Sequence, residues 1–290
     1  MPYLASRVGD PIGPFTTALT TRDILAYSAG LGATDARYLD DARPGGVEAL
    51  PFQTVSLEWP VVVSERAANE TGLSPEEVGR QVHAVQDSIF HRPFRAGDVV
   101  EANGMVVEAR ENRAGVLTVN KVMTTDQATG EPIATSWSTV IYRQTKLAGE
   151  PISLETAPPL PIDPTVPLPV DATETTVHIP REMPHVYTEC ARIWNPVHTE
   201  RAEALAAGLP DIILHGTATW ALAGLEILRS YRDGECALKR FTGRFVGMVI
   251  PGTDITIRHA PDPSDPNIIR YEVLTHDGKR AIDQGAALLD

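Results

Sequence analysis

Hydrophobic and polar residues alternate over two separate stretches of the chain, one in each half. A period of two is typical of strands that bury one face of a sheet. The first stretch predicts strands over residues 83–89, 98–110, 115–125 and 133–142. The second predicts strands over residues 239–245, 254–259, 268–275 and 280–288. Turn signals that contain glycine connect neighbouring runs at residues 111–115, 129–130 and 277–278, so each set is expected to form an antiparallel sheet.

A long apolar run precedes each set of strands. The two runs, residues 52–67 and 216–231, have the length of a buried helix rather than that of a strand. One long helix against an antiparallel sheet of several strands is an α+β arrangement. The sequence therefore predicts two α+β units, each with a sheet wrapped around a central helix, which is the hot-dog arrangement.

A proline-rich stretch separates the two halves. Its prolines are Pro151, Pro158, Pro159, Pro161, Pro164, Pro167 and Pro169. Proline lacks the backbone donor and restricts the residue before it, so the stretch is expected to be an extended, semi-rigid spacer. We therefore predict an N-terminal unit at residues 1–148, a linker at 149–172 and a C-terminal unit at 173–290.

The two halves also agree in the order and spacing of their elements. Tyr27 and Tyr187 each begin a short helical stretch, which an irregular loop and the long apolar helix follow. Residues 90–98 and 245–253 each place a turn glycine after an apolar pair, just before a strand. This agreement indicates an internal duplication.

Composition narrows the class of function. The chain has 290 residues, is 42% hydrophobic and carries a formal net charge of -13, so neither a nucleic acid nor an acidic membrane surface is an expected partner. Cys190 and Cys236 form no paired motif. The first residues lack the apolar run of a signal peptide, and no run reaches the length of a membrane span. A cytoplasmic protein is expected.

The segment from Tyr187 to His198 carries the clearest motif. It reads Tyr-Thr-Glu-Cys-Ala-Arg-Ile-Trp-Asn-Pro-Val-His, and Ala204 follows after five further residues. A second motif, Leu-Pro-Asp-Ile-Ile-Leu-His-Gly-Thr, covers residues 209–217. Together they resemble the signature of the hydratase 2, or MaoC-like dehydratase, family over residues 184–231. The resemblance implies a double hot-dog fold and an enzyme of fatty acid metabolism, a hydro-lyase that interconverts a 2-enoyl-CoA and a 3-hydroxyacyl-CoA thioester.

The resemblance assigns catalytic roles to His198 and Gly216. His198 would be the general base that takes a proton from water; the plainer alternative is a polar residue at the start of a helix. Gly216 would open the long helix and offer its backbone N–H to the thioester oxygen; the plainer alternative is an ordinary N-cap glycine. For each residue the functional reading depends on the family motif.

Four further residues are candidates for substrate binding. Asn195 and Pro196 would fix the loop that presents the histidine, although a plain turn explains them equally well. His215 would line the pocket or simply bond to backbone. Arg244, with its neighbours Lys239 and Arg240, would meet the phosphates of coenzyme A, or only solvent at a strand edge.

One departure from the family pattern bears directly on the chemistry. Where the family has Gly-Asp, this chain has Arg192-Ile193, and in the family that Asp and the His jointly hold the water. An isoleucine cannot accept a proton, so either His198 acts alone or with another carboxylate, or hydration is impaired, or the activity differs. Glu189 is the candidate for that carboxylate. It lies four positions before Ile193, and residues four positions apart on a helix share a face.

The first half has lost the motif. Tyr38 stands where His198 stands in the second half, and Asp35 where Asn195 stands. The first half is therefore expected to be structural, with its long helix helping to hold the acyl tail. A fused pair of units also replaces the dimer that single hot-dog proteins form, and a homodimer of such fused chains is a further expectation.

Two other functions remain open at this point. A thioesterase is the rival on the same fold, since hot-dog scaffolds host both chemistries. A non-catalytic acyl-CoA-binding subunit is the rival from another class, motivated by Ile193. No metal and no cofactor is expected, because the chain contains neither paired metal-ligand histidines nor a glycine-rich nucleotide loop.

Overall fold

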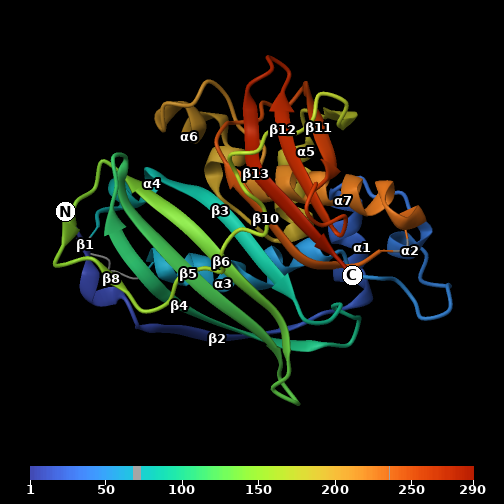
Figure 1. Cartoon of the computed structure of the whole chain (residues 1–290). Helices are drawn as coiled ribbons and strands as arrows, with labels where there is room; N and C mark the ends of the chain where they lie inside the picture. The colour runs from blue at the N-terminus through green and yellow to red at the C-terminus, as the bar shows by residue number, and fades with distance from the viewer. Residues whose placement is uncertain (68–72, 235) are drawn as a thin grey trace. The chain divides into compact units, whose positions relative to one another are not determined.

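The computed structural model describes residues 1–67, 73–234 and 236–290 of the chain (Figure 1). Two compact units build it. Unit 1 comprises residues 1–18, 57–92 and 99–159, and unit 2 comprises residues 19–56, 93–98 and 160–290. Among the described residues, no helix is both long and apolar enough to cross a membrane.

Unit 1 is a sheet of antiparallel strands with the helix α3 (Thr54–Ala67) on one face. The strand order is β2 (Pro11–Ala18), β4 (Val99–Glu111), β5 (Gly115–Asp126), β6 (Pro132–Arg143) and β3 (Gln81–Phe90). Val61 of α3 packs on Ile12, Ala102, Val106 and Val122 from three of these strands. Short elements complete the unit: α4 (Pro75–Gly79), the parallel pair β1 (Tyr3–Leu4) and β7 (Leu147–Ala148), and β8 (Ile152–Ser153) beside β4.

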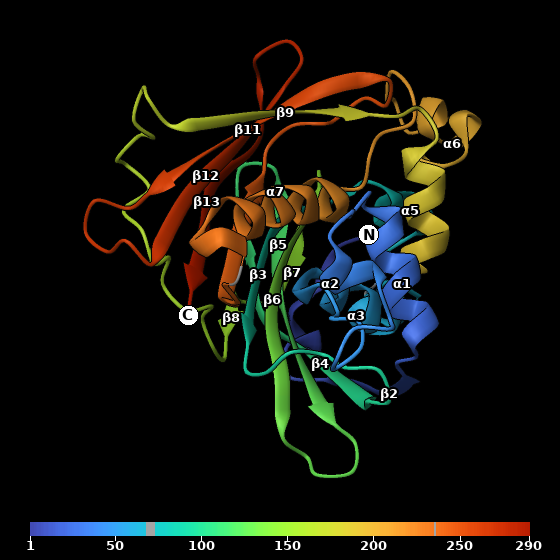
Figure 2. The ribbon, with the colours of Figure 1, turned by 90° about the vertical axis from the view of Figure 1, so that its right-hand side faces the viewer.

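Unit 2 has the same plan around a second long helix, α7 (Gly216–Ser230). Its antiparallel sheet has the order β10 (Leu238–Phe245), β13 (Arg280–Leu289), β12 (Ile268–Thr275), β11 (Thr253–Pro261) and β9 (Thr173–Ile179). Figure 2 shows α7 lying across one face of this sheet. Most of the residues of α7 are buried, and Trp220 packs on Phe241 of β10 with ring centroids 4.8 Å apart.

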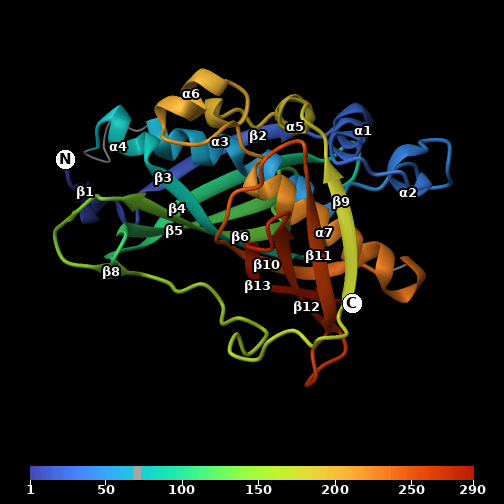
Figure 3. The same cartoon turned by 90° about the horizontal axis from the view of Figure 1, so that it is seen from above.

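A segment from the first half of the sequence completes unit 2. It contains α1 (Thr21–Gly30) and α2 (Ala36–Leu39), and α1 lies beside α5 (Met183–Ala191) in Figures 2 and 3. The ring of Phe52 lies 5.4 Å from that of Trp220 and 5.2 Å from that of Phe241. The core around α7 is therefore closed by residues that precede it by more than a hundred positions.

The expected α+β fold is confirmed. Each of the eight predicted strands exists to within two residues at either end, and the two predicted long helices correspond to α3 and α7. The strands β2 and β9, which lie at the start of each half, were not predicted, because their sequences, PIGPFTTA and TETTVHI, contain few apolar residues.

The proline-rich stretch is divided between the two units. Residues 149–159 belong to unit 1 and residues 160–172 to unit 2. Within unit 2, Ile162 is buried against Ile268 and Ala286, and the guanidinium of Arg270 donates to the carbonyl oxygen of Asp163 at 3.0 Å. This part of the linker is thus attached to its own sheet, and the boundaries at residues 148 and 173 stay a prediction about how the chain is organised.

Candidate active site

His198 lies in a short 3-10 turn, Pro196–His198, that follows α5. The side chain is half-buried, and its Nδ1 lies 2.8 Å from the carbonyl oxygen of Ile213. A carbonyl only accepts hydrogen bonds, so Nδ1 must carry the proton. In the neutral ring Nε2 is then the basic nitrogen. The backbone therefore fixes both the orientation and the tautomer of this histidine.

His215 stacks on His198. The two ring centroids are 3.8 Å apart with an interplanar angle of 25°, and Nε2 of His215 lies 3.2 Å from Oγ1 of Thr188. His215 is buried, and that burial lowers its pKa well below the ordinary value of 6.5, an effect to which the neighbouring His198 adds. His215 is thus an uncharged, flat neighbour at neutral pH. The sequence suggested that it lines a pocket or bonds to backbone. Its side chain contacts the side chains of His198 and Thr188 and also interacts with the backbone of Ile193, and a place in a pocket stays a prediction.

Gly216 begins α7, with His215 as the N-cap residue. A Cβ atom at this position would lie 3.2 Å from the ring of Phe245, so the close approach of that ring favours glycine. The first N–H groups of a helix have no acceptor within the helix and form the positive end of its dipole. Because Gly216 follows His215 directly, the structure brings this helix start close to the His198 imidazole, while the catalytic roles of the two residues stay a prediction.

Asn195 and Pro196 shape the loop. Asn195 is extended, and its carbonyl oxygen accepts from the N–H of His198 at 3.0 Å. Pro196 occupies the first position of the 3-10 turn, where its missing N–H costs nothing. Both residues hold His198 by backbone geometry.

A chain of hydroxyl groups lies beside the histidine pair. The hydroxyl of Tyr187 donates to Oγ1 of Thr217 at 3.3 Å and lies 3.4 Å from the hydroxyl of Tyr27. Tyr27 in turn donates to the carbonyl oxygen of Phe52 at 2.8 Å. Burial raises the pKa of Tyr187 to about 12, so these hydroxyls stay protonated near neutral pH. Sequence reasoning paired Tyr27 with Tyr187 by position but did not predict that the two would touch.

The position of the missing family carboxylate is apolar. Ile193 is buried, and its N–H donates to the carbonyl oxygen of Thr188 at 3.1 Å. Glu189, the candidate replacement, is exposed on α5. Arg192, which ends α5 in a left-handed conformation, forms an ion pair with Asp23 at 2.6 Å. The replacement by Glu189 therefore finds no support in its placement.

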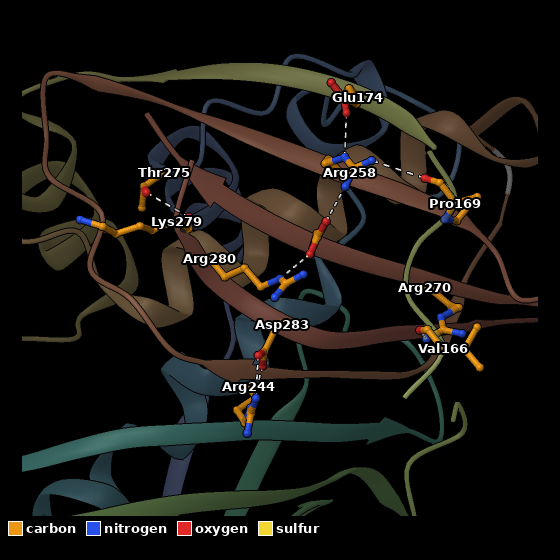
Figure 4. A network of polar contacts seen from close by, with 11 residues as sticks. Val166, Pro169, Glu174, Arg244, Arg258, Arg270, Thr275, Lys279, Arg280 and Asp283 are labelled. Atoms are coloured by element: carbon orange, nitrogen blue, oxygen red, sulfur yellow. Dashed lines mark hydrogen bonds and ion pairs between the residues drawn. The ribbon is translucent and has the colours of Figure 1, made fainter. Parts of the chain in front are cut away.

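Arg244 is engaged in an ion pair. Its Nε and one terminal nitrogen donate to the two carboxylate oxygens of Asp283 at 2.7 and 2.6 Å. Figure 4 shows this pair together with Arg258 and Arg280. Both of these arginines donate to Glu272, at 2.6 and 2.7 Å. Arg240 is buried, so the three basic residues of the sequence cluster are not one exposed patch. A role of Arg244 in binding phosphate stays a prediction and would require it to leave Asp283.

The counterparts of the motif in the first half have structural partners. Tyr38 is buried and its hydroxyl accepts from Arg37, while Asp35 accepts from Arg229 at 2.9 Å. Within the described parts of the chain, no three potential metal ligands gather at one place.

Two family models match the chain. A MaoC like domain matches residues 168–261, and the dehydratase domain region of FAS1-like proteins matches residues 6–136. The first match contains His198 and Gly216, and the second covers most of the first half.

Curated relatives give the same picture. The 3-hydroxyacyl-thioester dehydratase Y of Mycobacterium tuberculosis is 24% identical over 289 residues, 96% of this chain and 96% of that protein. The fatty acid synthase subunit beta of Aspergillus oryzae is 33% identical over 102 residues, 35% of this chain but only 4% of that subunit.

Solved structures show the fold. A MaoC-like dehydratase from Phytophthora capsici superposes with a TM-score of 0.82 at 18% identity, covering 98% of this chain and 97% of that one. A Mycobacterium tuberculosis protein described as having a double hot-dog fold superposes with a TM-score of 0.63 at 14% identity, covering 100% and 98%. The molecule is thus a double hot-dog protein. Its second half contains a MaoC like domain, and its first half matches the dehydratase domain region of FAS1-like proteins.

Proposed function

We propose that the chain adds water to a 2-enoyl-CoA thioester, and removes it from the 3-hydroxyacyl-CoA, with His198 as the acid–base residue. The observation that carries this proposal is the geometry of His198. Its tautomer is fixed by the Ile213 carbonyl, so Nε2 is the basic nitrogen of the ring, and the ring stacks on His215, the N-cap residue of α7. The relative named 3-hydroxyacyl-thioester dehydratase supports the same reaction.

The chemistry follows from these groups. Nε2 of His198 takes a proton from water while the water oxygen attacks the β-carbon of the enoyl group. Negative charge develops on the thioester oxygen, where the N–H of Gly216 and the positive end of α7 stabilise it. The imidazolium then returns the proton to the α-carbon, so one molecule of water is added in total.

A single histidine serves both proton transfers in this proposal. The support is that Ile193 occupies the family carboxylate position and that Glu189 is exposed. His198 stacks on His215, and His215 is neutral because burial lowers its pKa. No second positive charge therefore lies on the stacked ring when His198 becomes an imidazolium.

The experiment that tests the proposal uses crotonyl-CoA and follows the enoyl absorbance and the free thiol separately. Loss of absorbance without thiol release means hydration, and release of thiol means a thioesterase. Neither signal means an acyl-CoA-binding subunit or an acyl chain that the enzyme does not accept. His198→Ala should lower the rate of hydration by about 10²–10⁴-fold, the usual cost of losing a general base. His276→Ala, the same change at an exposed histidine, is the control and should keep full activity.

A cytoplasmic location is also proposed. Its support is that both cysteines are free thiols, as a reducing compartment favours. A homodimer of these chains stays a prediction.

A further inference from the structure

Thr217 is the second residue of α7, and it differs in exposure from the two tyrosines of the hydroxyl chain to which it belongs. Tyr27 and Tyr187 are fully buried, whereas Thr217 is partly exposed. All three belong to unit 2. Thr217 lies two positions after His215, whose ring stacks on His198. It is therefore the member of the hydroxyl chain that is accessible at the helix start beside the histidine pair.

The direction of each hydrogen bond in this chain follows from the number of protons. The carbonyl oxygen of Phe52 can only accept, so the hydroxyl of Tyr27 donates its one proton there, at 2.8 Å. Tyr187 donates its one proton to Oγ1 of Thr217 at 3.3 Å. No proton remains for the contact between the two tyrosines, which is the longest of the three at 3.4 Å. None of these bonds uses the proton of Thr217 itself.

The proton of Thr217 has no acceptor in the part of the chain that the structure describes. Thr219, two positions further along α7, instead donates to the carbonyl oxygen of His215 at 3.3 Å. A hydroxyl that accepts a hydrogen bond becomes a stronger donor, because the two bonds polarise each other. Burial raises the pKa of Tyr187 to about 12, so Tyr187 keeps the proton that it donates. Thr217 is thus a polarised donor at the start of α7.

We propose that the hydroxyl of Thr217 donates a hydrogen bond to the thioester oxygen of the substrate, as a second donor beside the N–H of Gly216. Tyr187 is then a positioning residue, which orients and polarises this hydroxyl without touching the substrate. Thr217 keeps its proton throughout, so the proton transfers of His198 are unchanged. The bond strengthens as negative charge develops on the oxygen, so it stabilises the transition state more than the bound substrate. This inference rests on the proposed function and deepens it.

The first test compares variants of Thr217 in the hydration of crotonyl-CoA. Thr217→Val removes the hydroxyl and should lower kcat by about 10²–10³-fold, the usual cost of one lost oxyanion donor, with KM nearly unchanged. Thr217→Ser keeps the hydroxyl and should retain most of the activity. Thr217→Ala removes the same hydroxyl and replaces the valine variant if that variant does not fold. The matched control is Thr242→Val, because Thr242 is buried in β10 with an unpartnered hydroxyl, and it should keep full activity.

Two tyrosine variants test the direction of the chain. Tyr187→Phe removes the bond that polarises Thr217, so it should lower kcat, but by less than Thr217→Val does. Tyr27→Phe is the same change at the neighbouring ring, whose centroid lies 6.0 Å away and whose proton goes to Phe52. It should leave kcat within a few-fold of the wild type. A loss of kcat in Tyr27→Phe as large as that in Tyr187→Phe would contradict the assigned direction.

A second measurement needs no turnover. Acetoacetyl-CoA ionises to an enolate whose negative charge lies partly on the thioester oxygen, and the enolate absorbance reports the ionised fraction. At one pH, acetoacetyl-CoA should be more ionised when bound to the wild type than when bound to Thr217→Val, because a hydrogen bond to the anion favours ionisation. Equal ionisation in the two proteins, or full kcat in Thr217→Val, would overturn the inference. A wild type that shows this difference in ionisation but does not hydrate crotonyl-CoA would contradict the proposed hydration alone.

Discussion

At the scale of single residues, the stacked histidines predict how stability depends on pH. An unfolded histidine binds a proton near pH 6.5, whereas burial holds the pKa of folded His215 well below that value. Below about pH 6.5 the unfolded state therefore binds more protons, and the free energy of unfolding falls as the pH falls. The slope contributed by one such group reaches about 1.4 kcal/mol per pH unit.

Urea unfolding at several values between about pH 7.5 and about pH 5.5 measures this slope. His215→Asn should flatten it, because the variant has no histidine to protonate at this position. His276→Asn makes the same change at an exposed site and should leave the slope as in the wild type. If His215→Asn and wild type show parallel pH profiles, His215 is not held neutral by burial.

Sequence reasoning reached part of the site at this scale. His198 and His215 are 17 residues apart in the sequence, and the resemblance of the two motifs to a family pattern selected His198 and Gly216 as catalytic candidates. The carbonyl of Ile213, the hydroxyl of Thr188 and the contact with Tyr27 could not be predicted. A backbone acceptor has no sequence signature, and a hydroxyl partner depends on how α1, α5 and α7 approach one another.

At the scale of elements, α7 depends on one close approach to the segment 19–56. A Cβ atom on Gly224 would lie 2.0 Å from Cζ of Phe52 and 3.0 Å from Cε1 of Phe241. Phe52 is fully buried, so its ring has little room to move. Gly224→Ala should therefore destabilise the protein by about 1–3 kcal/mol or more, despite the better helix propensity of alanine. Urea unfolding or a thermal melt measures the loss.

Gly79→Ala is the control for this change. Gly79 ends the helix α4, and a Cβ atom there would meet nothing within 4 Å. Its substitution should be neutral or slightly stabilising. A stable Gly224→Ala protein would show that Phe52 can move away from α7.

The elements themselves were the most predictable feature. Strands such as β5 and β12 alternate or lie between clear turn signals, and α7 is a long apolar run, so local pattern was sufficient. The short helices α1 and α2 were predicted only as a helical stretch and a loop. Tyr27 of α1 bonds to the carbonyl oxygen of Phe52, whose ring packs on Trp220 of α7. This packing joins distant parts of the chain, so no local sequence pattern predicts it.

At the scale of the whole molecule, the two halves of the sequence are not the two compact units. Residues 19–56 belong to unit 2, where Asp23 pairs with Arg192, Asp35 pairs with Arg229, and Arg37 donates to the carbonyl oxygen of Gly234. The proline-rich stretch at residues 149–172 indicated a boundary between an N-terminal and a C-terminal half. The repeated order of elements indicates a duplication, whereas the packing of the segment 19–56 on α7 has no signal in the composition.

This organisation predicts that the C-terminal half will not fold alone. A fragment of residues 173–290 would lack Phe52 and would expose the rings of Trp220 and Phe241, which are fully buried in the intact chain. We expect such a fragment to bind a hydrophobic dye and to melt without a cooperative transition, because its core is left open on one side. Joining residues 19–56 to residues 160–290 through a flexible linker should restore a cooperative melt, since the covering ring of Phe52 and the ion pairs return. A fragment 173–290 that unfolds cooperatively and hydrates crotonyl-CoA would instead support an independent catalytic unit with the boundary that the proline-rich stretch suggests.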